Sequence, residues 1–281
     1  MILSGRGEST FQSYIRAIAQ ASLHYRKLPL LLSDNEINQY LTLHKTGQLD
    51  RLKPSEAYFK HAVFGFRYMY KTFGIPDRHI AMPIMKRKKH ISDILNRYEV
   101  IELLNACRLK KHKIIFALAY GSGLRISEVT KCRIRDIDVV RKTVHVRDSK
   151  NGYDRIVPIS DDFIRGYMDY LNTEQIVDYI FPGQKKGYPI SISAIQHALI
   201  TARRKANIYK KISMHNLRHS YATHFLEDTG DLLLLKRYLG HRDIKNTMRY
   251  LKSAQAIPES DPYSPLTKVF ELARLNNKNK V

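Results

Sequence analysis

The chain has 281 residues, of which 43% are hydrophobic, so it is long enough to fold into two ordinary domains with buried cores. Lysine and arginine number 48 against 26 aspartate and glutamate, and the net charge of +22, spread over both halves, predicts a polyanionic partner. No run approaches the roughly 18 apolar residues of a membrane span, and the amino terminus lacks an apolar signal core, so we expect a cytosolic protein without a membrane partner.

The first part of the sequence is patterned for helices. Apolar residues recur at spacings near 3.6 after three candidate helix starts, and the third pattern ends near Gly74 and Pro76. The candidate starts are Ser9 or Thr10, Ser33 or Asp34, and Ser55. These segments predict a small all-helical domain over residues 7–78.

A basic linker is expected over residues 79–93. Pro83 interrupts helix, and the positive charges of the cluster KRKKH at 86–90 repel one another, which favours an extended chain. The cluster is either a solvated charge run or a strap along the phosphates of the partner. In the second case the binding residues are Lys86, Arg87, Lys88 and Lys89.

The second part combines helices with one hairpin. KTVHVRDSKNGYDRIVPI, at 142–159, alternates apolar and polar residues around an Asn151-Gly152 pair, which is a strong hairpin signal. We therefore expect a mainly α fold with a small antiparallel β-sheet over residues 94–257. The predicted helices lie near Ser92 and Asp93, and near 114–123, 161–172, 191–206, 213–227, 231–239 and 243–251.

One predicted helix carries a candidate anion site. In ISMHNLRHSYATHFLE, Ser213 is a plausible N-cap, and His215 and Arg218 share a face in the first turns. A helix amino terminus favours anions, and an arginine fork adds directed donors to phosphate oxygens. Read alone, the pair predicts either a phosphate site or two ordinary surface residues.

A metal site is the competing interpretation of these histidines. His215 and His219 are four residues apart, with His224 and His241 further on, but no HExxH motif or completing cysteine or carboxylate is present. Arg218 would also place a cation beside the ion. We expect no metal and no cofactor, and plain core thiols at the two cysteines.

Several separate blocks occur together in the second part: YGSGLRISEV, HNLRHSYATH, LLLLKRYLGH and RDIKNTMRYL. In this order and spacing they resemble the tyrosine recombinases, the phage-integrase and Xer type of site-specific DNA recombinase. The resemblance is strong over residues 94–255. The helical first domain resembles the family's core-binding domain more loosely.

The resemblance implies a catalytic set with assigned roles. Tyr250 would attack a DNA phosphodiester and form a 3′-phosphotyrosyl link, which conserves bond energy and needs no metal or ATP. The arginines would bind the nonbridging oxygens and Lys150 would act as general acid. His215 would act as base, and His241 would hydrogen-bond the phosphate. The implied residues are Arg125, Lys150, His215, Arg218, His241 and Tyr250, with Glu128 supporting them or favouring its own helix start.

The lysine is the member that departs from the family's pattern. Ser149 precedes Lys150 where relatives usually have glycine, and Lys142, before the strand, is the alternative.

Three function classes are compatible with these motifs. The first is a recombinase acting on double-stranded DNA with a specific site, either an integrase of a mobile element or an Xer-like resolvase of chromosome or plasmid dimers. The second is a type IB topoisomerase-like enzyme, and the third is a DNA-binding protein without catalysis, which the intact polar set disfavours.

The carboxyl-terminal tail, 258–281, contains a predicted amphipathic helix at 264–275. The resemblance implies that this helix docks on a neighbouring copy and ties four subunits together on two duplexes. Folding back on its own domain is the alternative. The sequence leaves open whether Tyr250 serves its own site or a neighbour's.

Overall fold

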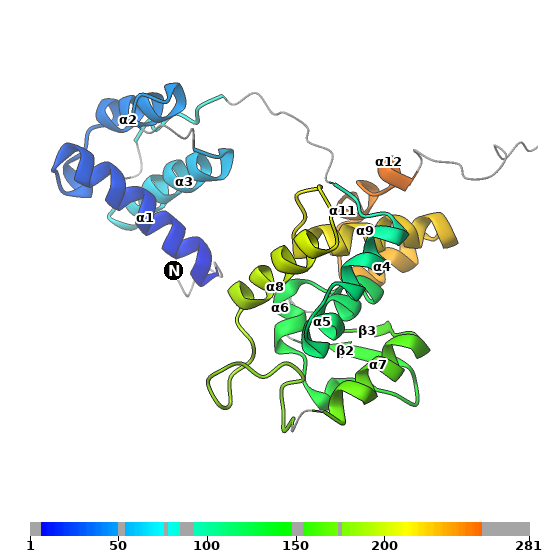
Figure 1. Cartoon of the computed structure of the whole chain (residues 1–281). Helices are drawn as coiled ribbons and strands as arrows, with labels where there is room; N and C mark the ends of the chain where they lie inside the picture. The colour runs from blue at the N-terminus through cyan, green and yellow to red at the C-terminus, as the bar shows by residue number, and fades with distance from the viewer. Residues whose placement is uncertain are drawn as a thin grey trace, which may run out of the picture. The chain divides into compact units, whose positions relative to one another are not determined.

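The computed structural model describes residues 7–49, 54–75, 78–84, 93–147, 154–173 and 176–254. The chain divides between residues 90 and 91 into two compact units, each built mainly from helices, and the second unit also holds a small antiparallel sheet. The predicted fold class is therefore confirmed (Figure 1). Within the described ranges, no helix has the length and apolar character needed to cross a membrane.

Two of the three helices of the first unit begin at their predicted N-caps, whereas α1 begins before Ser9, at Glu8, with Gly7 as its N-cap and no side-chain cap. Ser33 and Glu36 form reciprocal hydrogen bonds at the start of α2, and the Ser55 hydroxyl accepts from the Tyr58 backbone N–H at the start of α3. The apolar faces meet in a core around Phe59. The elements are α1 (Glu8–Tyr25), η2 (Pro29–Leu31), α2 (Asp34–Thr46) and α3 (Glu56–Thr72).

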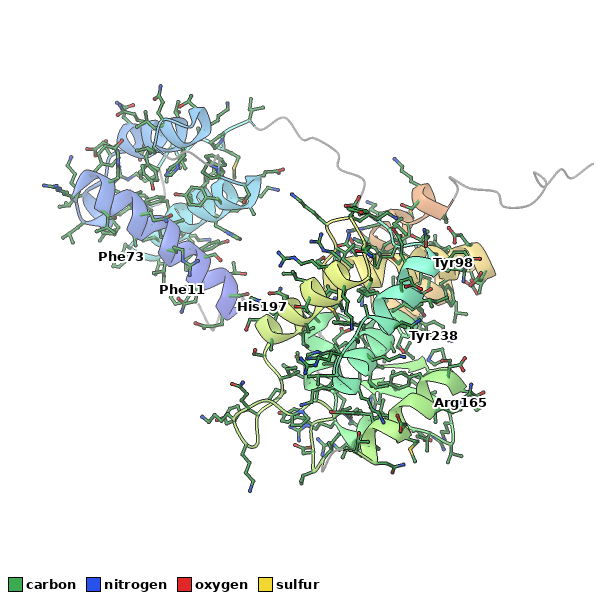
Figure 2. The ribbon with its side chains drawn as sticks, viewed as in Figure 1. Phe11, Phe73, Tyr98, Arg165, His197 and Tyr238 are labelled. Atoms are coloured by element: carbon green, nitrogen blue, oxygen red, sulfur yellow. The ribbon has the colours of Figure 1, made fainter. Side chains whose placement is uncertain are left out.

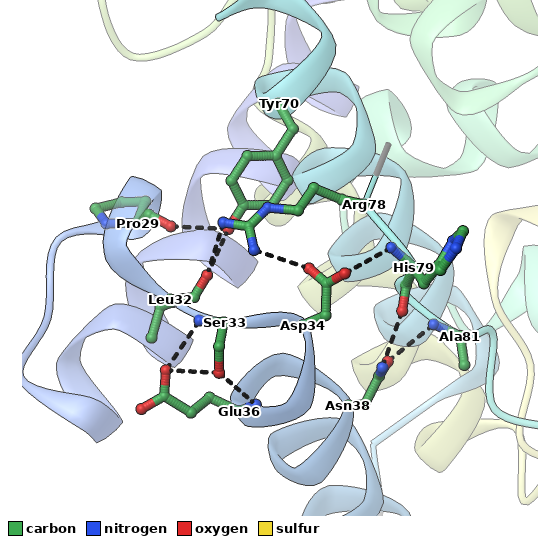
Figure 3. A network of polar contacts seen from close by, with 10 residues as sticks. All are labelled: Pro29, Leu32, Ser33, Asp34, Glu36, Asn38, Tyr70, Arg78, His79 and Ala81. Atoms are coloured by element: carbon green, nitrogen blue, oxygen red, sulfur yellow. Dashed lines mark hydrogen bonds and ion pairs between the residues drawn. The ribbon is translucent and has the colours of Figure 1, made fainter. Parts of the chain in front are cut away.

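An extended segment after α3 packs against α2 (Figure 3). The Asp34 carboxylate accepts hydrogen bonds from the Arg78 guanidinium at 3.1 Å and from the His79 backbone N–H at 2.7 Å. The Asn38 amide oxygen accepts from the backbone N–H of Ala81 at 2.8 Å. These bonds attach the segment to the first unit, although most of it lies in the stretch that the sequence predicts as a linker.

The second unit opens with α4, which begins later than predicted. Asn96, rather than Ser92 or Asp93, caps this helix and accepts from the Glu99 backbone N–H at 2.8 Å. The preceding Leu95 N–H donates instead to a serine hydroxyl of α9, which keeps that residue out of the helix. The elements are α4 (Arg97–Asn105), α5 (Lys110–Gly121), α6 (Ile126–Lys131), η3 (Ile134–Asp136), β1 (Ile137–Asp138), β2 (Thr143–Val146), β3 (Arg155–Pro158), α7 (Asp161–Leu171), α8 (Ile192–Lys205), α9 (Met214–Thr229), α10 (Leu232–Leu239), α11 (Lys245–Met248) and α12 (Leu251–Ala254).

The sheet has the antiparallel strand order β1-β2-β3. Strands β2 and β3 form the predicted hairpin, in which Val144 faces Val157 and Val146 faces Arg155. These four side chains lie on the buried face, so an arginine occupies an inward position beside three valines. The predicted turn residues, Asn151-Gly152, lie outside the described residues.

Helix α9 is buried on most of its faces and packs against α5 and α12 (Figure 1). Met214 and Leu217 of its predicted stripe are buried, and Tyr221 and Phe225 are half-buried. The helix also buries polar side chains, namely Arg218, His219, Ser220, Thr223 and His224.

The helix predicted over residues 243–251 is not a single helix. The structure has two one-turn helices there, α11 and α12, separated by a bend at Tyr250. The Asp243 carboxylate accepts from the Lys245 N–H at 2.9 Å, two residues on, and does not cap a longer helix. The Tyr250 N–H donates to the Thr247 carbonyl at 3.0 Å, three residues back, and this tighter turn separates α11 from α12.

Candidate active site

Side-chain hydrogen bonds fix the amino terminus of α9. Asn216 Oδ1 accepts from the Ser213 backbone N–H at 2.9 Å and from its hydroxyl at 2.6 Å, and Asn216 Nδ2 donates to the Asp93 carbonyl at 2.7 Å. His215 is consequently at the surface, whereas Arg218, nearly one turn later, points inward and is 1% exposed. Both residues lie at this end of the helix, but they do not share one exposed face as the sequence pattern predicted, because Arg218 is buried.

Backbone carbonyl groups hold the buried Arg218 guanidinium. Nη1 donates to the Gly123 carbonyl and Nη2 to the Leu239 carbonyl, each at 2.6 Å. Gly123 has a φ of +60°, and a Cβ there would lie 2.4 Å from the Tyr221 ring, so this close turn requires glycine. Burial, followed by the charge of Arg125, lowers the pKa of Arg218 to about 10, so the group remains cationic at neutral pH.

Glu128 is the buried carboxylate of the site. It accepts from the Arg125 backbone N–H and from Arg125 Nη1, both at 2.8 Å, and Arg218 Nη1 lies 3.8 Å from Oε2. Arg155 Nη1 and Nη2 donate to the two carboxylate oxygens at 3.0 and 2.7 Å. Burial alone would raise the pKa of Glu128, but the hydrogen bonds and charge of Arg155, together with Arg125, hold this pKa at about 2. Three arginines therefore surround one carboxylate and leave an excess of positive charge.

His241 links the arginines to the tyrosine. Its Nε2 lies 3.2 Å from Arg218 Nη2, which can only donate, so Nε2 accepts. Its Nδ1 then carries the proton and donates to the Thr247 hydroxyl at 2.9 Å. Burial and the charges of Arg218 and Arg125 lower the pKa of His241 to about 3, so the ring is neutral.

Tyr250 lies against two histidine rings. Its ring is stacked with that of His241, with centroids 6.3 Å apart, and meets the ring of His219 edge-on at 5.1 Å. His219 in turn contacts His215 at 4.1 Å. Tyr250 is 4% exposed, and burial raises the pKa of its hydroxyl against the opposing charges of Arg218 and Arg249.

The structure brings most of the predicted site residues together. The direct contacts described above connect Arg125, Glu128, His215, Arg218, His241 and Tyr250, with His219 between His215 and Tyr250.

Several predicted residues fall on parts of the chain that the structure does not describe. Lys150, and the basic cluster Lys86, Arg87, Lys88 and Lys89, lie outside the described residues, as does the segment 264–275. The alternative lysine, Lys142, forms an ion pair with Asp161 at 2.8 Å.

Sequence reasoning missed Arg155. This residue is 8% exposed, and its Nε donates to the Tyr238 carbonyl at 2.6 Å in addition to the two bonds to Glu128. The signal was present in the alternation of β3, because Arg155 falls on the same face as Val157 and Ile159. A charged residue at an inward position requires a buried partner.

Arginines, histidines and a buried tyrosine thus converge in a mainly helical unit, and the described residues contain no group of three potential metal ligands among His, Cys, Asp and Glu. This fold and site define a protein of the tyrosine recombinase class. The model described as the Phage integrase family matches residues 93–256, more than half of the chain, and the chain therefore belongs to this family. It is a site-specific DNA recombinase.

Proteins named as integrases or recombinases are similar to this chain over most of its length. A protein of Sinorhizobium fredii whose name describes it as an integrase/recombinase is 30% identical over 248 residues, which cover 88% of this chain and 79% of the relative. Tyrosine recombinase XerA of Saccharolobus solfataricus is 25% identical over 257 residues, covering 89% of this chain and 84% of the relative.

Solved structures share the fold at lower identity. A lambda integrase dimer bound to a COC′ core site superimposes with a TM-score of 0.70 at 17% identity, over 94% of this chain and 77% of that chain. A crystal structure of XerA recombinase gives a TM-score of 0.54 at 22% identity, over 98% of this chain and 95% of that chain.

Proposed function

We propose that Tyr250 is the nucleophile with which this recombinase cleaves DNA. Its hydroxyl attacks the scissile phosphorus, the bond to the 5′ oxygen breaks, and a 3′-phosphotyrosyl link remains. The link conserves the energy of the phosphodiester bond, so a 5′ hydroxyl can reverse the reaction without ATP. The observation that carries the proposal is the stacking of Tyr250 on His241, whose Nε2 accepts from the buried Arg218.

The arginines are proposed to bind the scissile phosphate. The Arg125 side chain is 25% exposed and donates Nη1 to Glu128, so its outer N–H groups remain available for a nonbridging oxygen. Arg218 lies behind the site and supplies fixed positive charge at low dielectric, where it stabilises the charge that develops on the pentacoordinate phosphorus. This pair does the work for which other nucleases use a divalent metal.

The histidines are proposed to move and orient protons. Burial, aided by the charges of Arg218 and Arg249, lowers the pKa of His215, so this ring is neutral near pH 7 and can accept the tyrosine proton. His241 orients the tyrosine ring. For His241 to donate to the phosphate, its proton must move from Nδ1 to Nε2, and a phosphate oxygen must replace Arg218 Nη2 as the partner of Nε2.

Lys150 is proposed to protonate the departing 5′ oxygen. This assignment rests on its place in the hairpin sequence. The ion pair between Lys142 and Asp161 supports Lys150 over the alternative, because Lys142 is already engaged at the start of α7.

The proposed substrate is double-stranded DNA with a specific recombination site. A cavity of about 480 Å³ beside His241 is lined by Lys236, Arg237 and Arg242, which suits a phosphate backbone. We propose that the helical domain, 7–78, binds the DNA core, and that the linker cations follow its phosphates. One solved neighbour is a lambda integrase tetramer bound to a Holliday junction, and we propose a tetrameric synapse here, with the segment 264–275 joining the copies.

Integration of a mobile element is the biological role that we propose. Relatives named XerA and XerD support a second candidate, the resolution of chromosome or plasmid dimers. Both roles use the same strand exchange, and both place the protein at the nucleoid.

The test is covalent trapping on DNA. The probe is genomic DNA of the source organism, lightly nicked so that cleaved ends diffuse away, and incubated with protein in EDTA. We expect an SDS-resistant adduct whose attached sequences identify the site, and no adduct from Tyr250→Phe. Tyr238→Phe, a half-buried tyrosine on α10 whose ring packs on Phe225, is the control and should retain the adduct (Figure 2). An adduct that survives in Tyr250→Phe, or that requires a divalent metal, contradicts the proposal.

A further inference from the structure

Arg155 lies where three parts of the site meet. It is the first residue of β3, on the strand that leaves the predicted hairpin turn, and its side chain is 6% exposed. Its three described donors, Nε, Nη1 and Nη2, bind protein oxygen atoms. The guanidinium thus contacts other site residues and can influence the reaction through them.

The first contact determines how Arg125 is held. Arg155 donates to both oxygens of Glu128, and the same carboxylate accepts from the backbone and side chain of Arg125. A carboxylate gripped on both oxygens has one orientation in its plane. Arg155 therefore fixes the group that orients Arg125 towards the phosphate.

The second contact determines where α10 ends. Arg155 Nε binds the Tyr238 carbonyl, and the next carbonyl, that of Leu239, accepts from Arg218. A Cβ on Gly240 would lie 3.0 Å from Arg155 Cδ, so the chain turns directly over the arginine before it reaches His241. The same side chain therefore supports the turn that delivers His241.

We infer that Arg155 is a positioning residue that ties the β2–β3 hairpin to the phosphate-binding arginines and to the His241 turn. The inference rests on the proposed function of these residues. A displacement of the Arg155 guanidinium then changes the position of Arg125 and His241 together. Lysine cannot replace Arg155, because a point charge lacks the planar fork that grips both oxygens and the carbonyl.

A specific pH effect follows from the charges. Glu128 keeps its low pKa because cations offset its burial, and Arg155 is the largest of these contributions. Without Arg155, burial raises the pKa of Glu128. The carboxyl then takes up a proton as the pH falls, and Arg125 loses its partner. The ratio of variant to wild-type cleavage should fall with decreasing pH.

The experiment separates binding from cleavage. Duplexes carrying the site recovered by trapping, nicked near the cleavage point, are incubated with saturating protein, and the SDS-resistant adduct is followed over time. Arg155→Lys and Arg155→Gln should bind these duplexes with nearly wild-type affinity and cleave about 100-fold more slowly, the effect of misplacing reacting groups by about 1 Å. Arg155→Gln should lose further activity towards acid pH.

Two further variants keep the result interpretable. Arg147→Gln removes a similar hairpin contact, between Arg147 Nε and the buried Asp136 at 2.7 Å, and should cleave normally once bound. The double variant Glu128→Gln with Arg155→Gln should lose less activity than the product of the two single losses, because one of the two contacts of Arg155 acts through that carboxylate and the other supports the His241 turn. Cleavage by the Arg155 variants that equals that of Arg147→Gln, or multiplicative losses in the double variant, would overturn the inference. Failure of the wild-type chain to form an adduct would instead reject the proposed function.

Discussion

The site histidines are residues whose protonation is controlled by burial and by neighbouring arginines. Burial, His215 and then Arg249 lower the pKa of His219 to about 4, and burial with Arg218 lowers that of His241 to about 3. A neutral ring can accept a proton or stack on Tyr250 without repelling the guanidinium groups. The positive charge that awaits a phosphate thus comes from arginine, which cannot be titrated away near neutral pH.

This arrangement predicts acid sensitivity of the second unit. In the unfolded chain His219 binds a proton near pH 6.5, whereas in the folded chain it does so only near pH 4. The unfolded state therefore binds more protons between these values, and folding stability is lost as the pH falls through this range. His219 alone should contribute a loss of about 3 kcal/mol by pH 4.

Hydrogen exchange of α9 peptides in increasing urea, measured from pH 7 to pH 4 on the full chain, reports this loss. His219→Gln should flatten the pH dependence, whatever its stability at pH 7. His197→Gln, at an exposed position on α8, is the matched control and should leave the dependence unchanged (Figure 2). Equal pH dependence in His219→Gln and wild type would refute the assignment.

At the scale of elements, a glycine lies at each end of α10. Gly230, before the helix, and Gly240, after it, both adopt left-handed conformations, with φ of +66° and +62°. A Cβ at Gly230 would meet nothing within 4 Å, whereas a Cβ at Gly240 would contact Arg155. The two glycines therefore have the same left-handed backbone conformation, which strains any other residue, but only Gly240 lies against the Arg155 side chain.

Gly230→Ala should lower the stability of α10 by about 1 kcal/mol, the cost of the left-handed conformation. Gly240→Ala should lower it further and slow cleavage, because Arg155 must shift from Glu128 to accommodate the methyl group. Urea dependence of exchange in α10 peptides and the single-turnover cleavage rate measure the two effects. If both alanine variants cleave at the same rate, the Gly240 turn does not depend on Arg155.

The helices could be predicted from the sequence where local chemistry determines them. Ser33, Ser55 and Ser213 precede apolar stripes, and the helices begin at these residues. The predicted start of α4 was wrong because a distant contact determines it. The Leu95 backbone N–H donates to the hydroxyl of Ser220 in α9, more than a hundred residues away, and this bond keeps Leu95 out of α4. No local pattern contains that information.

The site shows the same division. The motif spacing indicated Arg218 and Tyr250, but not the burial of Arg218 between two carbonyl groups or the bend at Tyr250. Arg155 was not predicted as a site residue, because in a chain with a net charge of +22 one more arginine does not stand out from those expected to contact DNA. Only its position beside Glu128, 27 residues earlier, identifies its partner.

At the scale of the whole molecule, positive charge is the dominant property. The net charge of +22 extends through both units, and the sequence concentrates four cations at 86–89, just before the division between the units at residues 90 and 91. A chain that meets DNA with both units should release many counterions, so its affinity should depend steeply on salt. The slope of the logarithm of the association constant against the logarithm of the salt concentration is then proportional to the number of phosphates that the protein neutralises.

Replacement of Lys86, Arg87, Lys88 and Lys89 by glutamine tests whether this cluster contacts phosphates. If each cation neutralises one phosphate, the slope should become shallower by about 3 to 4, since each contact contributes about 0.9. Cleavage at saturating protein should be unaffected, because these residues are not part of the site chemistry. Fluorescence anisotropy with labelled site DNA between low and physiological salt measures the slope.

The matched control removes the same charge from lysines that are already paired. Four such residues form ion pairs with carboxylates, and their loss changes the net charge equally: Lys27, Lys60, Lys110 and Lys142. If affinity responds only to overall charge, both quadruple variants weaken binding alike and the cluster is an ordinary solvated run. If the cluster lies along the DNA, only its loss changes the slope by the number of contacts removed, because counterions are released by direct neutralisation of phosphates rather than by net charge at a distance.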